Sequence, residues 1–363
     1  MNRSFALAFA YIVALAALAI TPVSATQYQI VDLGTLGGST SCAYGINNSG
    51  QVVGEADIDA SKVSHAFLWQ AASPMRDLGT LGGDLSCAYA INNSGQVAGF
   101  SWGVNVGPHA CLWKDGSPMQ DLGTLGGFHS TAHGINESGQ VVGDSYLATG
   151  TDYHAFLWQA GSPMRDLGTF GGRSYADAIN NSGQVVGTAC LDAGNRTEHA
   201  FLWQSGSPMQ DLGTLGGVCS HARAINDSGQ VVGDAYLTGN SMQHAFLWQK
   251  GSPMQDLGTL GGSVSCAYGI NAGGQVAGWS FNTSGRQRAF LWQKGSPMQD
   301  LGTLGGGISL ALDINDSGWI VGEADSHGQL HAVMWVPVPE PSSILALLIG
   351  LAWVGGMVIR RRK

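Results

Sequence analysis

Charged side chains are scarce in this chain, and basic side chains are the scarcest. Only 11% of its 363 residues are charged, and 16 Lys and Arg stand against 25 Asp and Glu. Five of the basic residues lie at the two ends, so the middle of the chain is more acidic than the formal net charge of −9 indicates. An acidic surface repels the phosphate backbone of DNA and RNA. We therefore expect no nucleic-acid partner.

Sequence patterns for metals and cofactors are missing as well. The six Cys form no CxxC pair, the loop around Asp57 lacks the spacing of an EF-hand, and the Gly-Thr-Leu-Gly-Gly segments are followed by no Lys. These absences argue against zinc and phosphate-loop sites. Calcium in the Asp-rich loop of Asp57 and Asp59 stays open, without an EF-hand spacing to support it. We expect no metal and no cofactor. The sequence leaves the disulfide state of the Cys residues open.

Glycine, in contrast, is abundant and marks an internal repeat. The 55 Gly follow no Gly-X-Y period, which excludes a collagen. A motif of the form Asp-Leu-Gly-Thr-(Leu/Phe)-Gly-Gly recurs every 44 or 45 residues. Its seven copies begin at Asp32, Asp77, Asp121, Asp166, Asp211, Asp256 and Asp300. Residues 28–336 are therefore an array of repeats.

Each repeat contains four strand-like runs separated by turn signals. The first run ends in Ile-Asn, and an Asn-x-Ser-Gly turn leads to a second that begins Gln-Val-Val-Gly, as at 42–54. The third is His-Ala-Phe-Leu-Trp, as at 65–69, and a Gly-Ser-Pro-Met turn precedes the fourth, which leads through Asp-Leu-Gly. Asn, Gly and Pro favour such turns. Four short strands in each of seven units predict an all-β chain folded as a seven-bladed β-propeller.

The ends of the array favour a closed ring over the alternative, an open β-solenoid. The chain enters with a lone fourth-type strand at 28–33 and leaves after a third-type strand at 331–336. The N-terminal strand would complete the last blade and remove exposed sheet edges. We expect the repeated Trp to pack between blades. For the recurring His of the third strand and the Asp of Asp-Leu-Gly we expect structural roles, in a hydrogen bond and a turn.

These segments, in this order, are similar to the HAF-type extracellular repeat. The resemblance covers about residues 28–335 and rests on His-Ala-Phe-Leu-Trp together with Asp-Leu-Gly-Thr-Leu-Gly-Gly. It implies an exported bacterial protein without an assigned reaction.

The two ends of the chain differ from the repeats. Residues 1–25 are predicted to be a signal peptide, with Arg3 before an apolar stretch and a small-residue cleavage site at its end; an uncleaved anchor is the alternative. Residues 337–343 form a Pro-rich linker, the 16 apolar residues 344–359 a predicted single transmembrane helix, and 360–363 a basic cytoplasmic tail. A permanent C-terminal anchor is the alternative to processing.

The order Pro-Glu-Pro, apolar helix, basic cluster resembles the PEP-CTERM sorting signal. The resemblance implies that an exosortase-type processing protease recognises Pro339, Glu340 and Pro341. It also implies an exported chain that is transiently anchored in the inner membrane by its C-terminal helix and then reaches the cell surface or a biofilm matrix. The same tail has been labelled an ice-binding-protein C-terminal domain. The repeats do not support that label, because their Thr recur about every 45 residues rather than in flat arrays.

One position inside the repeat changes chemistry from copy to copy. It lies two residues before the Ile of the first strand, and one interpretation is that it forms a ligand ring at the mouth of a central channel. Its residues in that ring are Tyr44, Tyr89, His133, Asp177, Arg223 and Tyr268, with Leu312 in the last copy. Aromatic faces beside hydrogen-bonding edges suit a sugar. The other interpretation, which the sequence favours, is drift at a tolerant, half-exposed position.

The sequence thus leads to two functional hypotheses. The first is an exported, non-catalytic surface or extracellular-matrix protein that binds polysaccharide. The second is a propeller hydrolase or lyase that acts on carbohydrate at the central channel. Catalysis would need carboxylates converging there, and Asp177 and Asp313 are the candidates for facing one another across the channel.

Overall fold

The computed structural model describes residues 27–104, 106–194 and 196–338. All regular secondary structure in these ranges is β-strand, and residues Ile30–Val336 form a compact unit. The predicted signal peptide, sorting motif, transmembrane helix and basic tail lie outside the described residues. Within the described part of the chain, no helix has the length and hydrophobicity that crossing a membrane requires.

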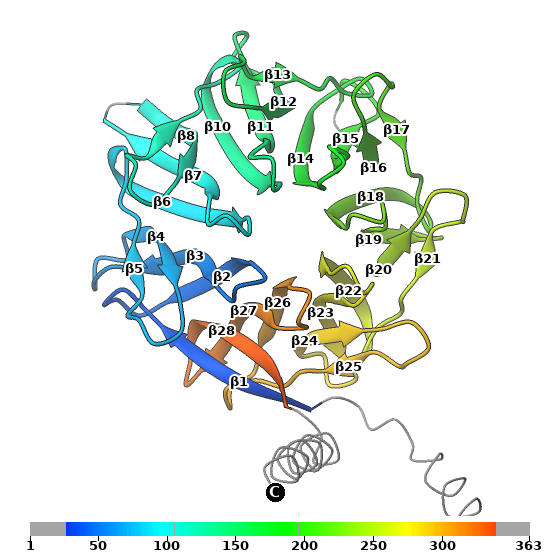
Figure 1. Cartoon of the computed structure of the whole chain (residues 1–363). Helices are drawn as coiled ribbons and strands as arrows, with labels where there is room; N and C mark the ends of the chain where they lie inside the picture. The colour runs from blue at the N-terminus through cyan, green and yellow to red at the C-terminus, as the bar shows by residue number, and fades with distance from the viewer. Residues whose placement is uncertain (1–26, 105, 195, 339–363) are drawn as a thin grey trace, which may run out of the picture. The chain divides into compact units, whose positions relative to one another are not determined.

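The strands are arranged in antiparallel sheets around a central axis (Figure 1). The strands nearest the axis are β2 (Ser41–Ile46), β6 (Gly82–Ile91), β10 (Gly126–Ile135), β14 (Ser174–Ile179), β18 (Gly216–Ile225), β22 (Gly261–Ile270) and β26 (Ser309–Ile314). The second strands are β3 (Val52–Asp57), β7 (Val97–Gly103), β11 (Val141–Leu147), β15 (Val185–Cys190), β19 (Val231–Leu237), β23 (Val276–Asn282) and β27 (Ile320–Ser326).

The outer strands follow in the same order. The third strands are β4 (Ser64–Trp69), β8 (Val106–Trp113), β12 (Tyr153–Trp158), β16 (Glu198–Trp203), β20 (Gln243–Trp248), β24 (Gln287–Trp292) and β28 (Gln329–Val338). The fourth strands are β5 (Arg76–Asp77), β9 (Gln120–Asp121), β13 (Arg165–Asp166), β17 (Gln210–Asp211), β21 (Gln255–Asp256), β25 (Gln299–Asp300) and the longer β1 (Gln27–Gly34). The prediction of an all-β chain with four strands in each repeat is confirmed.

Hydrogen bonding joins the two ends of the repeat array. Strand β1 pairs with β28, in a sheet of order β1-β28-β27-β26. The side chain of Asn315 donates to the carbonyl oxygen of Asn47 at 3.1 Å, and His331 bonds to Asp32 at 2.9 Å. The last repeat is therefore in direct contact with the first.

A buried serine hydroxyl links each sheet to the next. Ser86 Oγ, on β6, accepts the N–H of Ala66 on β4 at 2.9 Å and donates to the carbonyl of Gly79 at 2.7 Å. Because Ala66 and Ser86 are both shielded from water, this bond satisfies an amide that would otherwise be unpaired. The equivalent serines accept an Ala N–H in the same way; they are Ser41, Ser130, Ser174, Ser220, Ser265 and Ser309.

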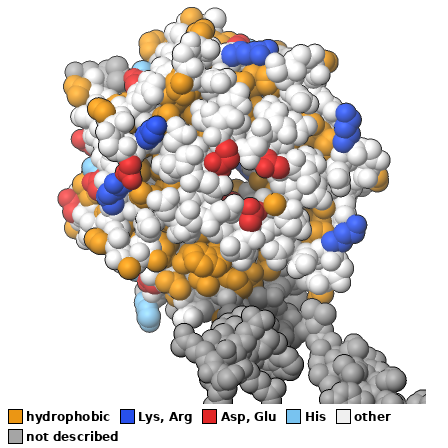
Figure 2. Space-filling model, viewed as in Figure 1, with side chains coloured by type: hydrophobic (Ala, Val, Ile, Leu, Met, Phe, Trp, Pro, Cys, Tyr) orange, Lys and Arg blue, Asp and Glu red, His pale blue; other side chains and the backbone are white. Residues whose placement is uncertain are grey.

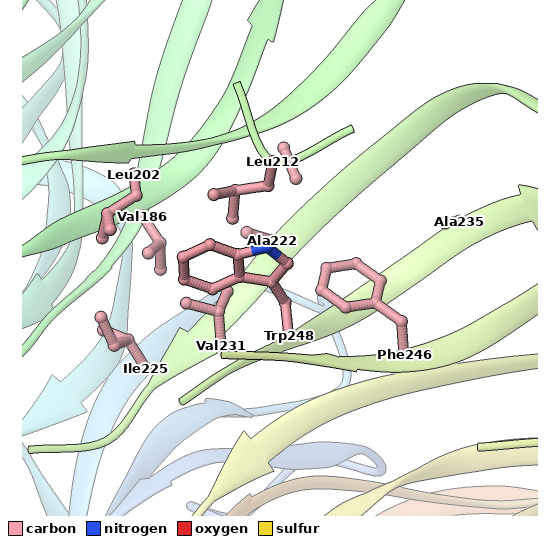
Figure 3. Packing of buried hydrophobic residues seen from close by; sticks show 10 residues of the cluster. Val186, Leu202, Leu212, Ala222, Ile225, Val231, Ala235, Phe246 and Trp248 are labelled. Carbon is pink, nitrogen blue, oxygen red and sulfur yellow. The ribbon is translucent and has the colours of Figure 1, made fainter. Parts of the chain in front are cut away.

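Aromatic side chains fill the space between sheets, as predicted. Figure 3 shows Trp248 of the β18–β21 sheet packed against Val186 and Leu202 of the preceding sheet. Trp113 adds a hydrogen bond across the same kind of junction, from its indole nitrogen to the carbonyl oxygen of Leu78. Burial of these large apolar surfaces is the main force that holds neighbouring sheets together.

The recurring His and Asp have the structural roles that the sequence indicates. His154 Nδ1 lies 2.8 Å from Asp166, which ties the third strand to the start of the Asp-Leu-Gly segment. The other carboxylate oxygen of Asp166 accepts the N–H of Gly168 at 2.7 Å and so shapes the turn. Five further His–Asp pairs have the same form: His65–Asp77, His109–Asp121, His199–Asp211, His244–Asp256 and His331–Asp32. In each of these pairs the His and Asp side chains bond to each other and stabilise the fold.

Candidate functional site: a chamber on the axis

A β-bulge presents the variable residue of each repeat to the axis. In the β2–β3 pair, Ala43 faces Gly54 and Gly45 faces Val53, so Tyr44 falls outside the register. A bulge of this kind re-aims one side chain. The same shift skips Tyr89, His133, Asp177, Arg223, Tyr268 and Leu312. Glycine is required opposite the bulge, because a Cβ at Gly54 would run into the carbonyl oxygen of Cys42.

The bulged residues line a chamber of about 580 Å³. All six residues of the predicted ring border it, together with Leu312, Asp313 and Glu323. Its base is formed by Ile residues of the Ile-Asn motifs, which also line the hollow on the other side. The chamber is thus one half of an axial channel that an apolar constriction divides.

The other half of the channel is bordered by amides and carboxylates. Each motif Asn donates from Nδ2 to the carbonyl oxygen of the next motif Asn, at 3.1 Å in every case. Glu137, Asp227 and Asp316 line this hollow, and Figure 2 shows acidic side chains gathered around a central opening. This mouth is held by bonds within the protein, and its carboxylates are separate from those of the chamber.

One side of the chamber is aromatic. The ring of Tyr89 lies between those of Tyr44 and His133, with centroid distances of 5.1 and 5.2 Å. Tyr44 donates to Glu55 at 2.9 Å, and His133 bonds to Asp144 at 2.8 Å. Burial raises the pKa of both tyrosines, so they stay neutral donors. The three rings are tilted against their neighbours, by 55° and 44°, and all three residues border the chamber.

The other side of the chamber is charged. The Arg223 guanidinium lies between Asp177, at 3.6 Å, and Asp234, at 3.4 Å, and it also covers the ring of Tyr268. Burial opposes its charge, but the two carboxylates outweigh that and raise the pKa of Arg223. His221 bonds to Asp234 at 2.6 Å and to Glu198 at 3.2 Å. These groups form one connected network beside the chamber.

Two carboxyl groups in the chamber are poorly solvated. Burial raises the pKa of Asp177 to about 6, against the opposing charge of Arg223. Burial likewise raises the pKa of Asp313 to about 6, although it accepts the backbone N–H groups of Ile46 and Ile314. Among the described residues, Asp177 Oδ2 is buried without a hydrogen-bond donor. Asp177 therefore has unmet capacity to accept a hydrogen bond, whereas each oxygen of Asp313 already accepts a backbone N–H.

Sequence reasoning missed the carboxylates behind the bulged residues. Glu55, Asp144, Asp234 and Glu323 each directly follow the glycine that faces the bulge. A signal was present, because this position varies among the repeats as Glu, Phe, Asp, Thr, Asp, Trp and Glu between nearly constant neighbours. Its proximity to the predicted ring depends on the strand register.

The C-terminal end of the chain matches a known family. Residues 337–363 match the PEP-CTERM protein-sorting motif, which confirms that part of the sequence prediction. The chain carries an exosortase-type sorting signal and is an exported protein. Comparison with curated proteins gives no match.

Comparison with solved structures gives distant matches. A puromycin-hydrolysing peptidase from Mycobacterium tuberculosis is 9% identical with a TM-score of 0.53, over 86% of this chain and 56% of the other. TolB from Acinetobacter baumannii is 10% identical with a TM-score of 0.46, over 76% of each chain. The lectin BP39L from Burkholderia pseudomallei is 9% identical with a TM-score of 0.48, over 86% and 96%. At such identities a match bears on the fold alone.

Proposed function

We propose that this chain is an exported surface or extracellular-matrix protein that binds a segment of polysaccharide in the axial chamber without cleaving it. In this proposal the repeats are of the HAF type and form a seven-bladed propeller that β1 closes. The sorting tail anchors the protein in the membrane, and an exosortase-type protease then processes it for the cell surface. The resemblances of the repeats and of the tail support export to a polysaccharide-rich surface.

One observation carries the binding role: the chamber joins three adjacent aromatic rings to a network of charged groups. The apolar face of a sugar ring stacks on aromatic side chains, while its hydroxyl groups need donors and acceptors at the rim. Tyr44, Tyr89 and His133 supply the faces, and Asp177 and Arg223 supply the polar edge. A volume of about 580 Å³ is in the range of small-ligand sites.

The second candidate, a hydrolase or lyase, is favoured by Asp177 and Asp313. Both line the chamber, and burial raises the pKa of each to about 6, near the range in which a carboxyl group acts as a general acid. A catalytic role is disfavoured because Asp313 accepts hydrogen bonds from two backbone N–H groups, which hold its side chain in place between the last and first repeats. We therefore place binding first.

The test is binding of the full-length protein, purified in mild detergent, to a panel of defined oligosaccharides by isothermal titration calorimetry. We expect saturable binding of at least one class, and loss of it in the double variant Tyr44→Ala/Tyr89→Ala. Trp102→Ala, which truncates an exposed aromatic residue outside the chamber lining, is the matched control and should bind normally. Chromatography of the sugar after incubation separates the two candidates, since shortened products would establish the enzyme. Binding that survives the double variant would place the site elsewhere.

A further inference from the structure

The charges around the chamber are unbalanced in favour of carboxylates. Asp177, Asp313 and Glu323 line it directly, against one guanidinium, that of Arg223, and the imidazole of His133. Behind this lining, Asp144 bonds to His133 and Asp234 bonds to Arg223. The basic groups are therefore already engaged by acidic neighbours, and the carboxylates outnumber them.

The few basic side chains near the chamber are shared between several carboxylates. One guanidinium serves both Asp177 and Asp234, and His221, which also bonds to Asp234, is shared with Glu198. Within the described ranges, no basic side chain forms an ion pair with Asp313 or Glu323. Lys62 lies in an adjoining groove that borders Tyr44 and Glu323, and it is not part of the chamber lining. An anionic sugar would therefore meet repulsion here, and a cationic one attraction.

We propose that the chamber selects an oligosaccharide that carries ammonium groups, such as a de-N-acetylated amino-sugar polymer, over neutral and acidic polysaccharides. This inference rests on the proposed function and names the ligand class of that site. Asp177 lines the chamber with its side chain 17% exposed, and an ammonium group would donate charge-assisted hydrogen bonds to such a carboxylate. The same group is attracted by the faces of Tyr44 and Tyr89, because aromatic rings bind cations on their faces.

The test compares hexamers of glucosamine, N-acetylglucosamine and galacturonate as ligands of the full-length protein in detergent, near pH 6.5 and about 20 mM salt. Replacing a neutral hydrogen bond with a charge-assisted one predicts binding of the glucosamine hexamer about five- to tenfold tighter than of its acetylated form. The galacturonate hexamer should bind most weakly. In about 500 mM salt the preference should fall, because the attraction is screened.

Two isosteric variants locate the effect. Asp177→Asn removes one chamber charge and should abolish most of the preference for glucosamine. Glu137→Gln makes the same change of charge at the opposite mouth of the channel and should keep the preference. Circular dichroism and the urea midpoint establish that each variant is folded. If Asp177→Asn does not fold, the salt dependence of the unaltered protein still decides the question.

The outcomes separate this inference from the function beneath it. Equal binding of the glucosamine and N-acetylglucosamine hexamers would overturn the charge selectivity and leave sugar binding in place. A preference that is insensitive to salt, or that Glu137→Gln abolishes as fully as Asp177→Asn, would also overturn it. Binding of none of the three hexamers, nor of any sugar in the wider panel, would refute the proposed function itself.

Discussion

Removing one hydroxyl from the junction between sheets should destabilise the fold strongly. In Ser86→Ala the N–H of Ala66 loses its acceptor and the carbonyl of Gly79 loses a donor. Ser86 and Ala66 are both 0% exposed, so water cannot replace the lost partner of the amide. The two bonds contribute about 1 kcal/mol each, and an unpaired buried amide costs about 1–3 kcal/mol. We expect the free energy of unfolding to fall by about 2–4 kcal/mol.

Urea unfolding followed by tryptophan fluorescence measures this loss, since Trp side chains lie in the junctions between sheets. Ser94→Ala is the matched control: it removes the same hydroxyl group from an exposed turn of the same repeat and should change stability by no more than about 0.5 kcal/mol. If Ser86→Ala proves as mild as Ser94→Ala, the serine hydroxyls do not hold the sheets together and the reasoning is wrong.

Two further variants test the junction core and the charged network. Trp248→Ala should cost about 3–5 kcal/mol in the same urea assay, because the indole fills the space against Val186 and Leu202, and Trp248→Phe should cost less; equal stability of all three proteins would contradict the packing role. Burial and the positive charge of Arg223 lower the pKa of His221. Its bonds to Asp234 and Glu198 outweigh both effects, so the pKa is raised. A raised pKa stabilises the fold at pH values below the unfolded pKa of about 6.5, and this stabilisation is lost as pH rises through the folded value. The stability difference between the unaltered protein and His221→Gln should therefore be larger at pH 5.5 than at pH 8.5, and an unchanged difference would show that the bonds do not favour the protonated imidazole.

The repeat made most of the fold predictable from the sequence. The run at 65–69 matches β4, Ser64–Trp69, because its apolar residues and flanking turns recur with a constant period. Structural roles for the recurring His and Asp followed from their presence in nearly every copy, whereas their pairing with each other, as in His154 and Asp166, is seen only in the structure. The fourth strand is shorter than its sequence suggests, at two residues in β5, because Asp77 turns the chain by accepting the N–H of Gly79.

The site was predictable only in part. Variation among the repeats identified Tyr44 and its counterparts, all of which border the chamber. The bulge that directs them there is an extra residue in a strand register, which the alternation of apolar and polar residues does not encode. Glu55 and Asp234 were missed for the same reason, since their partners Tyr44 and Arg223 lie on a neighbouring strand and the register alone pairs them.

The junctions between sheets also bear on how such a chain changes over generations. Every junction uses the same serine and asparagine bonds, so a repeat copied or exchanged by recombination meets matching partners on both sides. The bulged residue and the residue after the facing glycine travel with the repeat, and they carry the chemistry of the chamber. Exchange of whole repeats could then alter ligand preference in single steps without rebuilding the scaffold.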